Sequence, residues 1–170
     1  MKKYFSYLII YSFLGYILER IINLFVYGEL TDGGLMNMPL QPLYGVGIVL
    51  AILINDFFIS KLKMKKLIKN LLLLVVAIMT TALSEAVTGF GYYYITEVSL
   101  WDYGEFFTCT YKYVCVIPTS LFGLISFLSI KFFHNYFKDL YLFVNNYYFI
   151  AGLLVFLIDC YLVYYTAITL

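Results

Sequence analysis

The sequence predicts an all-α fold, a polytopic transmembrane helical bundle of about five helices. Of the 170 residues, 64% are hydrophobic and only 12% are charged, whereas water-soluble domains are about half apolar and a quarter charged. Five stretches reach the ~20 predominantly apolar residues that a helix needs to cross a bilayer. No stretch is polar enough to form a second domain, so we expect residues 1–170 to form a single transmembrane domain.

The expected spans cover residues 4–27, 42–60, 71–95, 113–133 and 147–170. The first span follows Lys2 and Lys3, as the apolar run of a signal peptide would. It is too long for that role, contains charged residues and lacks a small-residue cleavage site. We therefore expect an uncleaved first span. The second span begins with Pro42, a residue suited to the first turn of a helix.

The lysines predict the orientation of these spans. If the N-terminus is cytoplasmic, nine lysines lie in inner segments and only Lys112 lies in an outer one. Lysine and arginine accumulate in cytoplasmic loops, so this split predicts a cytoplasmic N-terminus, an external C-terminus, and outer loops at 28–41 and 96–112. The basic run from Lys61 to Lys69 is then mainly a topology determinant, with contact to anionic lipids as the alternative.

Ionised residues inside the expected spans are the best candidates for a functional site, because an ionised residue near the bilayer centre costs about 2.5–3.5 kcal/mol on insertion scales. Glu19 is 15 residues beyond Tyr4, and Glu85 is 14 beyond Leu71. At 1.5 Å per residue both lie roughly 21–23 Å across, in the outer half of the bilayer. Two carboxylates at one depth are able to share one site.

The neighbours of these carboxylates are small or polar. Ser12, Gly15, Glu19 and Asn23 form one stripe, and Thr81, Glu85, Thr88 and Gly89 form another. Small residues allow close helix approach, and hydroxyls satisfy buried carboxylates. Arg20 points away from Glu19 and is placed to reach Glu85. Three roles stay open: a binding or translocation site, an interhelical ion pair that only fixes packing, and snorkelling.

The first outer loop combines apolar residues with conformationally special ones. We expect Gly33, Gly34, Pro39, Pro42, Gly45, Gly47 and, in the other half, Gly89 to shape the backbone. The loop is too apolar for a free loop and too broken for a helix, which favours a short re-entrant segment buried in protein. Gly45 and Gly47 permit close packing or a kink in the helix that follows.

The second outer loop carries Trp101, the only tryptophan of the chain, and Asp102. One interpretation is an interfacial aromatic anchor with Asp102 as a cap or turn residue. The other is a lid whose Asp102 faces the Glu19/Glu85 pocket. Cys109 and Cys115 are spaced closely enough for a disulfide, but we expect two free thiols.

Two further carboxylates lie in or near the expected spans, and the order of the segments repeats. Asp159 has few polar neighbours in its span, so an oligomer contact or a protonated carboxyl is as plausible as a functional role. Asp56 is expected at the inner interface. The order of carboxylate, outer loop and Pro-containing helix start occurs twice, which suggests a parallel repeat of spans 1–2 and 3–4.

Some function classes are disfavoured. A net charge of +1 with no clustered basic surface argues against a nucleic-acid partner. No Walker A, dinucleotide-binding or zinc-protease motif occurs, and we expect neither a cofactor nor a metal. The single histidine, His134, lies near the inner end of its span, far from the carboxylates, which argues against a Ser/His/Asp arrangement.

Several sequence blocks resemble the putative ABC-transporter type IV, CmpB-like, family of bacterial membrane proteins. They are Phe13-Leu-Gly-Tyr-Ile-Leu-Glu19, Gly33/Gly34, Asn37, Pro39, Pro42-Leu-Tyr-Gly-Val-Gly47, Glu85-Ala-Val-Thr-Gly89 and Trp101-Asp-Tyr103. The resemblance runs from about Tyr4 to Phe133 and implies a small polytopic protein classed as a permease. Where family members often carry an arginine after the tryptophan block, this chain has Lys112.

The sequence thus predicts a permease or transport component of the bacterial inner membrane, with a polar intramembrane site open toward the outer side. The candidate binding residues are Glu19, Arg20, Asn23, Tyr44, Glu85, Thr88, Trp101 and Asp102. The alternatives are an intramembrane enzyme acting on a lipid or envelope precursor and a non-catalytic scaffold or regulatory protein. Expected partners are the lipid bilayer and either a separate ATPase subunit or further copies of the chain.

Overall fold

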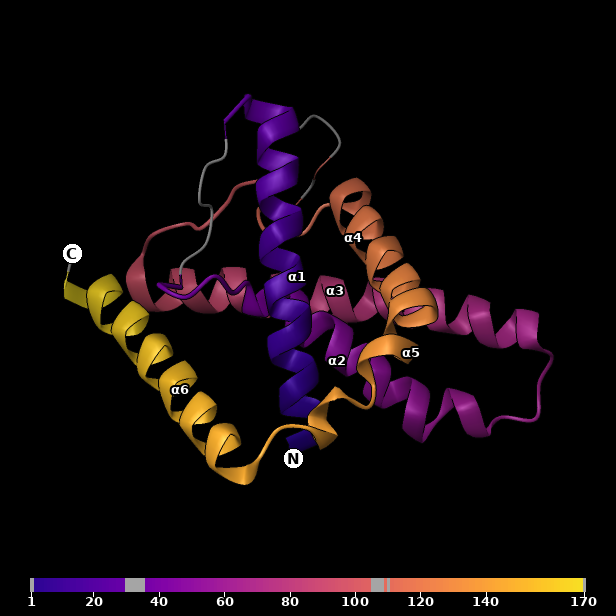
Figure 1. Ribbon diagram of the computed structural model, residues 1–170. Coiled ribbons are helices and arrows are strands. Elements are labelled where there is room, and N and C mark those ends of the chain that lie inside the picture. Colours follow the sequence, from indigo (N-terminus) through magenta and orange to yellow (C-terminus); the bar gives the residue numbers. More distant parts are fainter. Residues whose placement is uncertain (1, 30–35, 105–108, 110, 170) are drawn as a thin grey trace. The chain divides into compact units, whose positions relative to one another are not determined.

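A computed structural model describes residues 2–29, 36–104, 109 and 111–169, and these contain helices without strands (Figure 1). Five helical segments are long and apolar enough to cross a membrane, which confirms the predicted all-α membrane fold. The elements are α1 (Lys2–Tyr27), α2 (Pro42–Phe57), η1 (Ile59–Lys61), α3 (Lys66–Thr96), α4 (Val116–Leu128), η2 (Ser129–Phe133), α5 (His134–Phe137), η3 (Leu140–Leu142) and α6 (Asn146–Thr169).

The helix bounds differ from the predicted spans where polar residues join a helix. Helix α3 begins at Lys66 rather than at 71, because a helix extends past the hydrocarbon into the polar interface. Helix α4 begins after Cys115, whose extended backbone (φ −131°, ψ 133°) makes it the N-cap. A π-helical turn, η2, then joins α4 to α5, so the fourth helical stretch ends at Phe137.

The chain divides into two compact units, each described by itself below. Unit 1 contains residues 1–45 and 136–170, and unit 2 contains residues 46–135. Helix α2 therefore contributes its first turn to unit 1 and the rest to unit 2. The single domain and the repeat of helix pairs both stay predictions.

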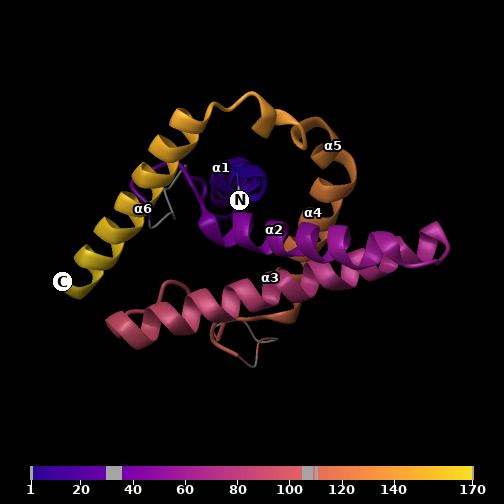
Figure 2. The same ribbon diagram turned by 90° about the horizontal axis from the view of Figure 1, so that it is seen from below.

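In unit 2, α3 packs against α2, beside which it runs in Figure 2, and against α4, at positions without bulky side chains. A Cβ at Gly47 of α2 would lie 3.5 Å from Ser84 Oγ, and a Cβ at Gly123 of α4 would lie 2.6 Å from Ile78 Cα. Association inside a bilayer relies on van der Waals packing of small residues, since lipid is as apolar as the helices. Gly47 and Gly123 thus allow two neighbours to approach α3 closely.

The hydroxyl groups on the buried face of α3 are satisfied within that helix. Thr81 Oγ1 donates to the Ala77 carbonyl (2.8 Å), and Ser84 Oγ donates to the Thr80 carbonyl (2.8 Å). Bonds of this type let polar side chains sit in an apolar environment without an external partner. We expected such hydroxyls to satisfy Glu85, and Thr81 instead bonds its own helix.

In unit 1, α1 packs against the first turn of α2. A Cβ at Gly15 would lie 2.6 Å from Tyr44 Cβ, and a Cβ at Gly45 would lie 2.7 Å from the Leu8 carbonyl oxygen. Each helix thus presents a glycine where the other approaches. The N-terminal half of α1 also contacts the segment after α5, where the buried Tyr7 hydroxyl donates to the Lys138 carbonyl (2.8 Å).

Residues 36–41 lead into α2 as irregular backbone that is bonded to two helices of unit 1. Gln41 N donates to the Ser12 carbonyl of α1 (2.9 Å). The carboxylate of Asp159 in α6 accepts from Asn37 Nδ2 (2.7 Å) and from Met38 N (3.0 Å). Three roles stayed open for Asp159 from the sequence alone, an oligomer contact, a protonated carboxyl and a functional role, and none of them specified a contact with this loop. Gly33 and Gly34 lie outside the described residues.

Candidate functional site

A buried carboxylate lies at the centre of the polar contacts in unit 2. Glu85 of α3 is 2% exposed. The Thr119 hydroxyl donates a hydrogen bond to its Oε2 atom (2.5 Å), and the side chain of Tyr103 also hydrogen-bonds it. Because an unsatisfied polar group in a membrane costs several kcal/mol, these two donors explain how the fold tolerates a carboxylate here.

Thr119 is placed by the start of α4. Its backbone N–H donates to the carbonyl of the N-cap residue, Cys115 (2.9 Å), so Thr119 closes the first turn of the helix. Pro118 precedes it in the same turn, where the missing proline N–H leaves no bond unmade. Thr119 is 3% exposed, and its hydroxyl faces α3.

Tyr103 is placed by the loop of residues 97–115, which folds back on itself. Helix α3 ends at Thr96, and the left-handed backbone of its C-cap residue, Glu97 (φ 59°), turns the chain. Tyr103 N then donates to the Lys112 carbonyl (2.7 Å). Trp101 Nε1 donates to the Tyr113 carbonyl (3.1 Å), so the two sides of the loop are joined at neighbouring positions.

Tyr113 is the packing centre of this loop. It is 1% exposed and makes edge-on ring contacts with Phe90 (4.9 Å between centroids) and Trp101 (6.1 Å). Its ring lies directly over Gly89, where a Cβ would come within 2.6 Å of Tyr113 Cγ. Gly89 is one helical turn beyond Glu85, so the aromatic cluster covers α3 next to the carboxylate.

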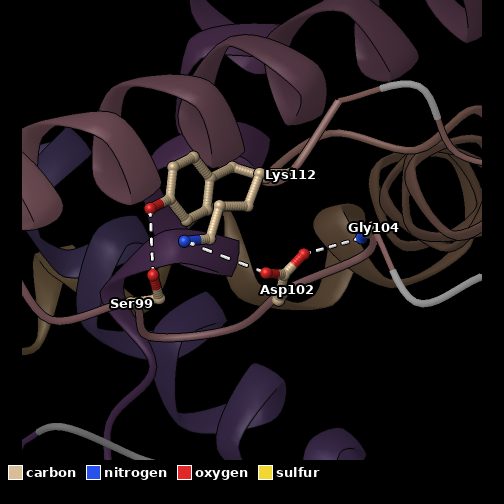
Figure 3. Close-up of polar contacts among 5 residues, drawn as sticks. Ser99, Asp102, Gly104 and Lys112 are labelled. Atoms are coloured by element: carbon tan, nitrogen blue, oxygen red, sulfur yellow. Dashed lines mark hydrogen bonds and ion pairs between the residues drawn. The ribbon is translucent and has the colours of Figure 1, made fainter.

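Polar contacts also order the exposed part of the loop (Figure 3). Ser99 Oγ lies 3.2 Å from the Tyr113 hydroxyl. Asp102 Oδ1 accepts from Gly104 N (2.7 Å), and Asp102 Oδ2 lies 3.8 Å from Lys112 Nζ. Both charged side chains are about two-fifths exposed, so the ion pair contributes little. Asp102 has the geometry of a turn residue, and its role as a lid stays a prediction.

The expectation of two free thiols in this loop is wrong, because Cys109 and Cys115 form a disulfide. The fold of the loop brings their Cα atoms to 5.0 Å, within the usual range for a disulfide. Cys115 is also the N-cap of α4, so the disulfide anchors the loop at the start of the helix that carries Thr119. Cys160 is a free, half-buried cysteine in α6.

The candidate residues of unit 1 lie in α1 and at the start of α2. Glu19, Arg20 and Asn23 are half-buried on α1, and the Arg20 guanidinium lies over the Tyr16 ring (4.9 Å to the centroid). Tyr44 packs on Gly15. Glu85 belongs to unit 2. A site that combines these residues with Glu85 therefore stays a prediction.

Four candidate residues lie in unit 2: Glu85, Thr88, Trp101 and Asp102. Thr88 is half-buried on α3, and Trp101 belongs to the aromatic cluster around Tyr113. Sequence reasoning missed Thr119 and Tyr103 as the partners of Glu85. Both belong to recognisable sequence motifs, Pro118-Thr-Ser and Trp101-Asp-Tyr103. The spacing of residues along the sequence gives no sign that the two motifs bind the same carboxylate.

No group of three or more His, Cys, Asp or Glu side chains that could hold a metal ion occurs among the described residues. The arrangement around Glu85 is instead a set of oxygen-bearing side chains: a carboxylate, a threonine hydroxyl and a tyrosine hydroxyl. Such a set binds ligands through hydrogen bonds and charge.

The sequence matches the family described as "Putative ABC-transporter type IV" over residues 6–166. The match includes most of α6 and so extends beyond the stretch from Tyr4 to Phe133 that carries the sequence blocks of the resemblance. No curated protein and no solved structure matches the chain. Because the family match covers nearly the whole sequence, the chain belongs to the "Putative ABC-transporter type IV" family of membrane proteins.

Proposed function

We propose that the chain is the membrane-embedded component of a transport system and that the buried carboxylate of Glu85 is part of its substrate-binding site. The observation that carries this proposal is the burial of Glu85 (2% exposed) in a helix long enough to span the membrane. Ionisable residues at such positions are rare and usually mark substrate or ion pathways. The family description supports transport as the process.

Tyr103 and Thr119 bind the carboxylate from two different elements, a loop and a helix start. A ligand that displaces the Tyr103 hydroxyl would release a bond of the loop of residues 97–115, and one that displaces the Thr119 hydroxyl would release a bond of α4. Glu19, Arg20, Asn23, Tyr44, Thr88, Trp101 and Asp102 are the further members that the sequence proposes for this site. Arg20 is the proposed counter-charge of Glu85.

The proposed orientation has the N-terminus in the cytoplasm and the C-terminus and loop 97–115 outside, in a bacterial inner membrane. The lysine distribution supports it. The Cys109–Cys115 disulfide is independent support, because disulfides persist in oxidising compartments outside the cytoplasm. In this orientation the polar site is approached from the outer side, past the aromatic cluster of Tyr113.

The proposed partner is a separate ATPase subunit. The sequence contains no Walker A motif, so ATP hydrolysis would come from another chain. The turn between α2 and α3 carries Lys61, Lys63, Lys65 and Lys66, whose side chains are exposed, and would face the cytoplasm in the proposed orientation. This turn is the proposed docking position, with a homo-oligomer as the other proposed assembly.

The test is retention of small molecules by the purified chain in lipid nanodiscs. The nanodiscs are incubated with a metabolite extract of the producing cells, washed and analysed by mass spectrometry. We expect a class of solute that the wild type retains and that Glu85→Gln and Thr119→Val lose. Ser126→Ala, which removes a buried hydroxyl bonded to its own helix, is the matched control and should retain it.

The outcome identifies which function is correct. Equal retention of a solute by the wild type and a folded Glu85→Gln variant would show that Glu85 does not bind it. A wild type that retains no solute would favour the scaffold alternative. Retention of a lipid or an envelope precursor, rather than a soluble solute, would instead favour the enzyme alternative, with a carboxylate as general acid or base.

A further inference from the structure

We infer that residues 36–41 form a re-entrant segment near the centre of the bilayer and that Asp159 is the clamp that holds it there. This inference goes beyond the proposed function, because it does not depend on whether the chain transports a solute. It concerns unit 1 alone. It also gives a role to Asp159, a buried carboxylate that the Glu85 site does not use.

The clamp consists of three N–H groups directed at one carboxylate. Asp159 Oδ1 accepts from Asn37 Nδ2 (2.7 Å) and Asn37 N (3.3 Å), and Oδ2 accepts from Met38 N (3.0 Å). Asp159 is 5% exposed, and it is the single buried side chain of α6. Hydrogen bonds to a charged acceptor are roughly twice as strong as neutral ones, and burial strengthens them further.

The position of Asp159 within α6 sets the depth of the segment. It lies 13 residues after Asn146 and 10 before Thr169. At 1.5 Å per residue these offsets are roughly 20 Å and 15 Å along the helix. The hydrocarbon core is about 30 Å thick, so the carboxylate lies near its middle. The backbone of Asn37 and Met38 must lie at the same level.

The other helix of unit 1 gives an independent depth. Gln41 N donates to the carbonyl of Ser12, which is 10 residues after Lys2, or roughly 15 Å along α1. Residues 36–41 therefore bond to the middle of two spanning helices. In both views of the fold, the segment before α2 lies between α1 and α6 (Figures 1 and 2).

The clamp supplies hydrogen-bond partners to backbone groups that a re-entrant segment would otherwise leave unbonded. Irregular backbone at membrane depth leaves N–H and C=O groups without helical partners, and it is tolerated only where protein supplies them. Here Asp159 bonds two backbone N–H groups, and Ser12 bonds a third. Leu40 is 3% exposed, so its side chain is enclosed by protein. Asn37 adds a side-chain donor to the same carboxylate.

The first experiment measures hydrogen–deuterium exchange of the full chain in phosphatidylcholine/phosphatidylglycerol nanodiscs. In Asp159→Asn one acceptor oxygen becomes an NH2 donor and the charge is lost, so the amides of residues 36–41 should exchange at least roughly tenfold faster, equivalent to ~1.4 kcal/mol. Peptides from the middle of α1 should keep their wild-type rates. Asp56→Asn, a carboxamide substitution at the end of α2, is the matched control and should leave residues 36–41 unchanged.

Two results would overturn the clamp. One is unchanged exchange in residues 36–41 of folded Asp159→Asn. The other is an equal rise in α1 and α6, because that would mean general destabilisation. If Asp159→Asn fails to fold, Asn37→Ala decides the question, since it removes one of the three donors and keeps the charge. It should raise exchange a few-fold in residues 36–41 alone, and no rise would refute the clamp.

The depth has its own measurement. A nitroxide attached at Met36→Cys, in a Cys160→Ala background, reports its position through collision with oxygen, which concentrates in the bilayer interior, and with a nickel chelate, which stays in water. We expect high oxygen and low nickel accessibility. The ratio typical of the headgroup region would refute the re-entrant position even if Asp159 binds the segment.

Discussion

The Thr119 hydroxyl donates a hydrogen bond to Oε2 of Glu85 and so joins the first turn of α4 to a buried position of α3. The two residues are 34 positions apart in the sequence. Around this bond, Gly123 brings α4 onto α3, and loop 97–115 adds Tyr103 to the same carboxylate. The close packing of α4 on α3 and the hydrogen bonding of the Glu85 carboxylate therefore depend on each other. Substitution of Thr119 tests this dependence.

Replacing Thr119 by valine should lower the thermal stability of the purified protein. Valine keeps the shape of threonine but removes the donor, and leaving a buried carboxylate one hydrogen bond short costs about 1–3 kcal/mol. The measurement is thermal unfolding in detergent. Ser126→Ala is the control on the same helix, because Ser126 bonds the Phe122 carbonyl of its own helix, and it should change stability little. Equal effects of both substitutions would contradict a special role for Thr119.

Two glycines of α3 should respond in opposite ways to alanine. A Cβ at Gly89 would lie 2.6 Å from Tyr113 Cγ, whereas a Cβ at Gly91 would meet nothing within 4 Å. Gly89→Ala should therefore destabilise by about 1–3 kcal/mol through overpacking. Gly91→Ala should be neutral or stabilise by up to ~1 kcal/mol, because alanine favours the helix. The midpoints of thermal unfolding compare the pair directly, and matching midpoints would show that Tyr113 does not pack on α3.

The disulfide should be visible in the number of reactive thiols. Among the three cysteines, a maleimide should label one in the denatured, unreduced protein and all three after reduction. The singly labelled residue should be Cys160. Cys109→Ser should destabilise by about 2 kcal/mol, the chain-entropy value for so short a loop. Three labelled cysteines before reduction would show that Cys109 and Cys115 are unbonded.

The features that the sequence predicts well are those that depend on local composition. The five spans follow from runs of apolar residues. Small residues allow helices to approach closely, and Gly15 of α1 lies where Tyr44 of α2 packs. The first and last residues of the helices were less predictable. Lys66 begins α3 although it is charged, because hydropathy locates the hydrocarbon rather than the end of a helix.

The features that sequence reasoning missed depend on contacts between distant segments. Asp159 and Asn37 are 122 positions apart, and no periodicity links an aspartate in an apolar helix to a loop asparagine. The disulfide could not be predicted from the spacing of Cys109 and Cys115, because pairing depends on the distance between their Cα atoms, which the fold of the loop sets. Thr81 lies one turn from Glu85 and looked like its partner, but a helix offers a threonine hydroxyl its own carbonyls.

The proposed orientation can be tested by labelling from each side of the membrane. Met64 lies in the turn between α2 and α3 and is 47% exposed. In a Cys160→Ala background, Met64→Cys should react with a membrane-impermeant maleimide only in inside-out vesicles. An epitope tag placed after residue 170 should be detected only in right-side-out vesicles. Three candidate spans lie between Met64 and the tag, so the two labels should lie on opposite sides of the membrane and each checks the other. Met64→Cys labelling in right-side-out vesicles would reverse the orientation, and loop 97–115 with its disulfide would then face the reducing cytoplasm, where such a bond rarely persists.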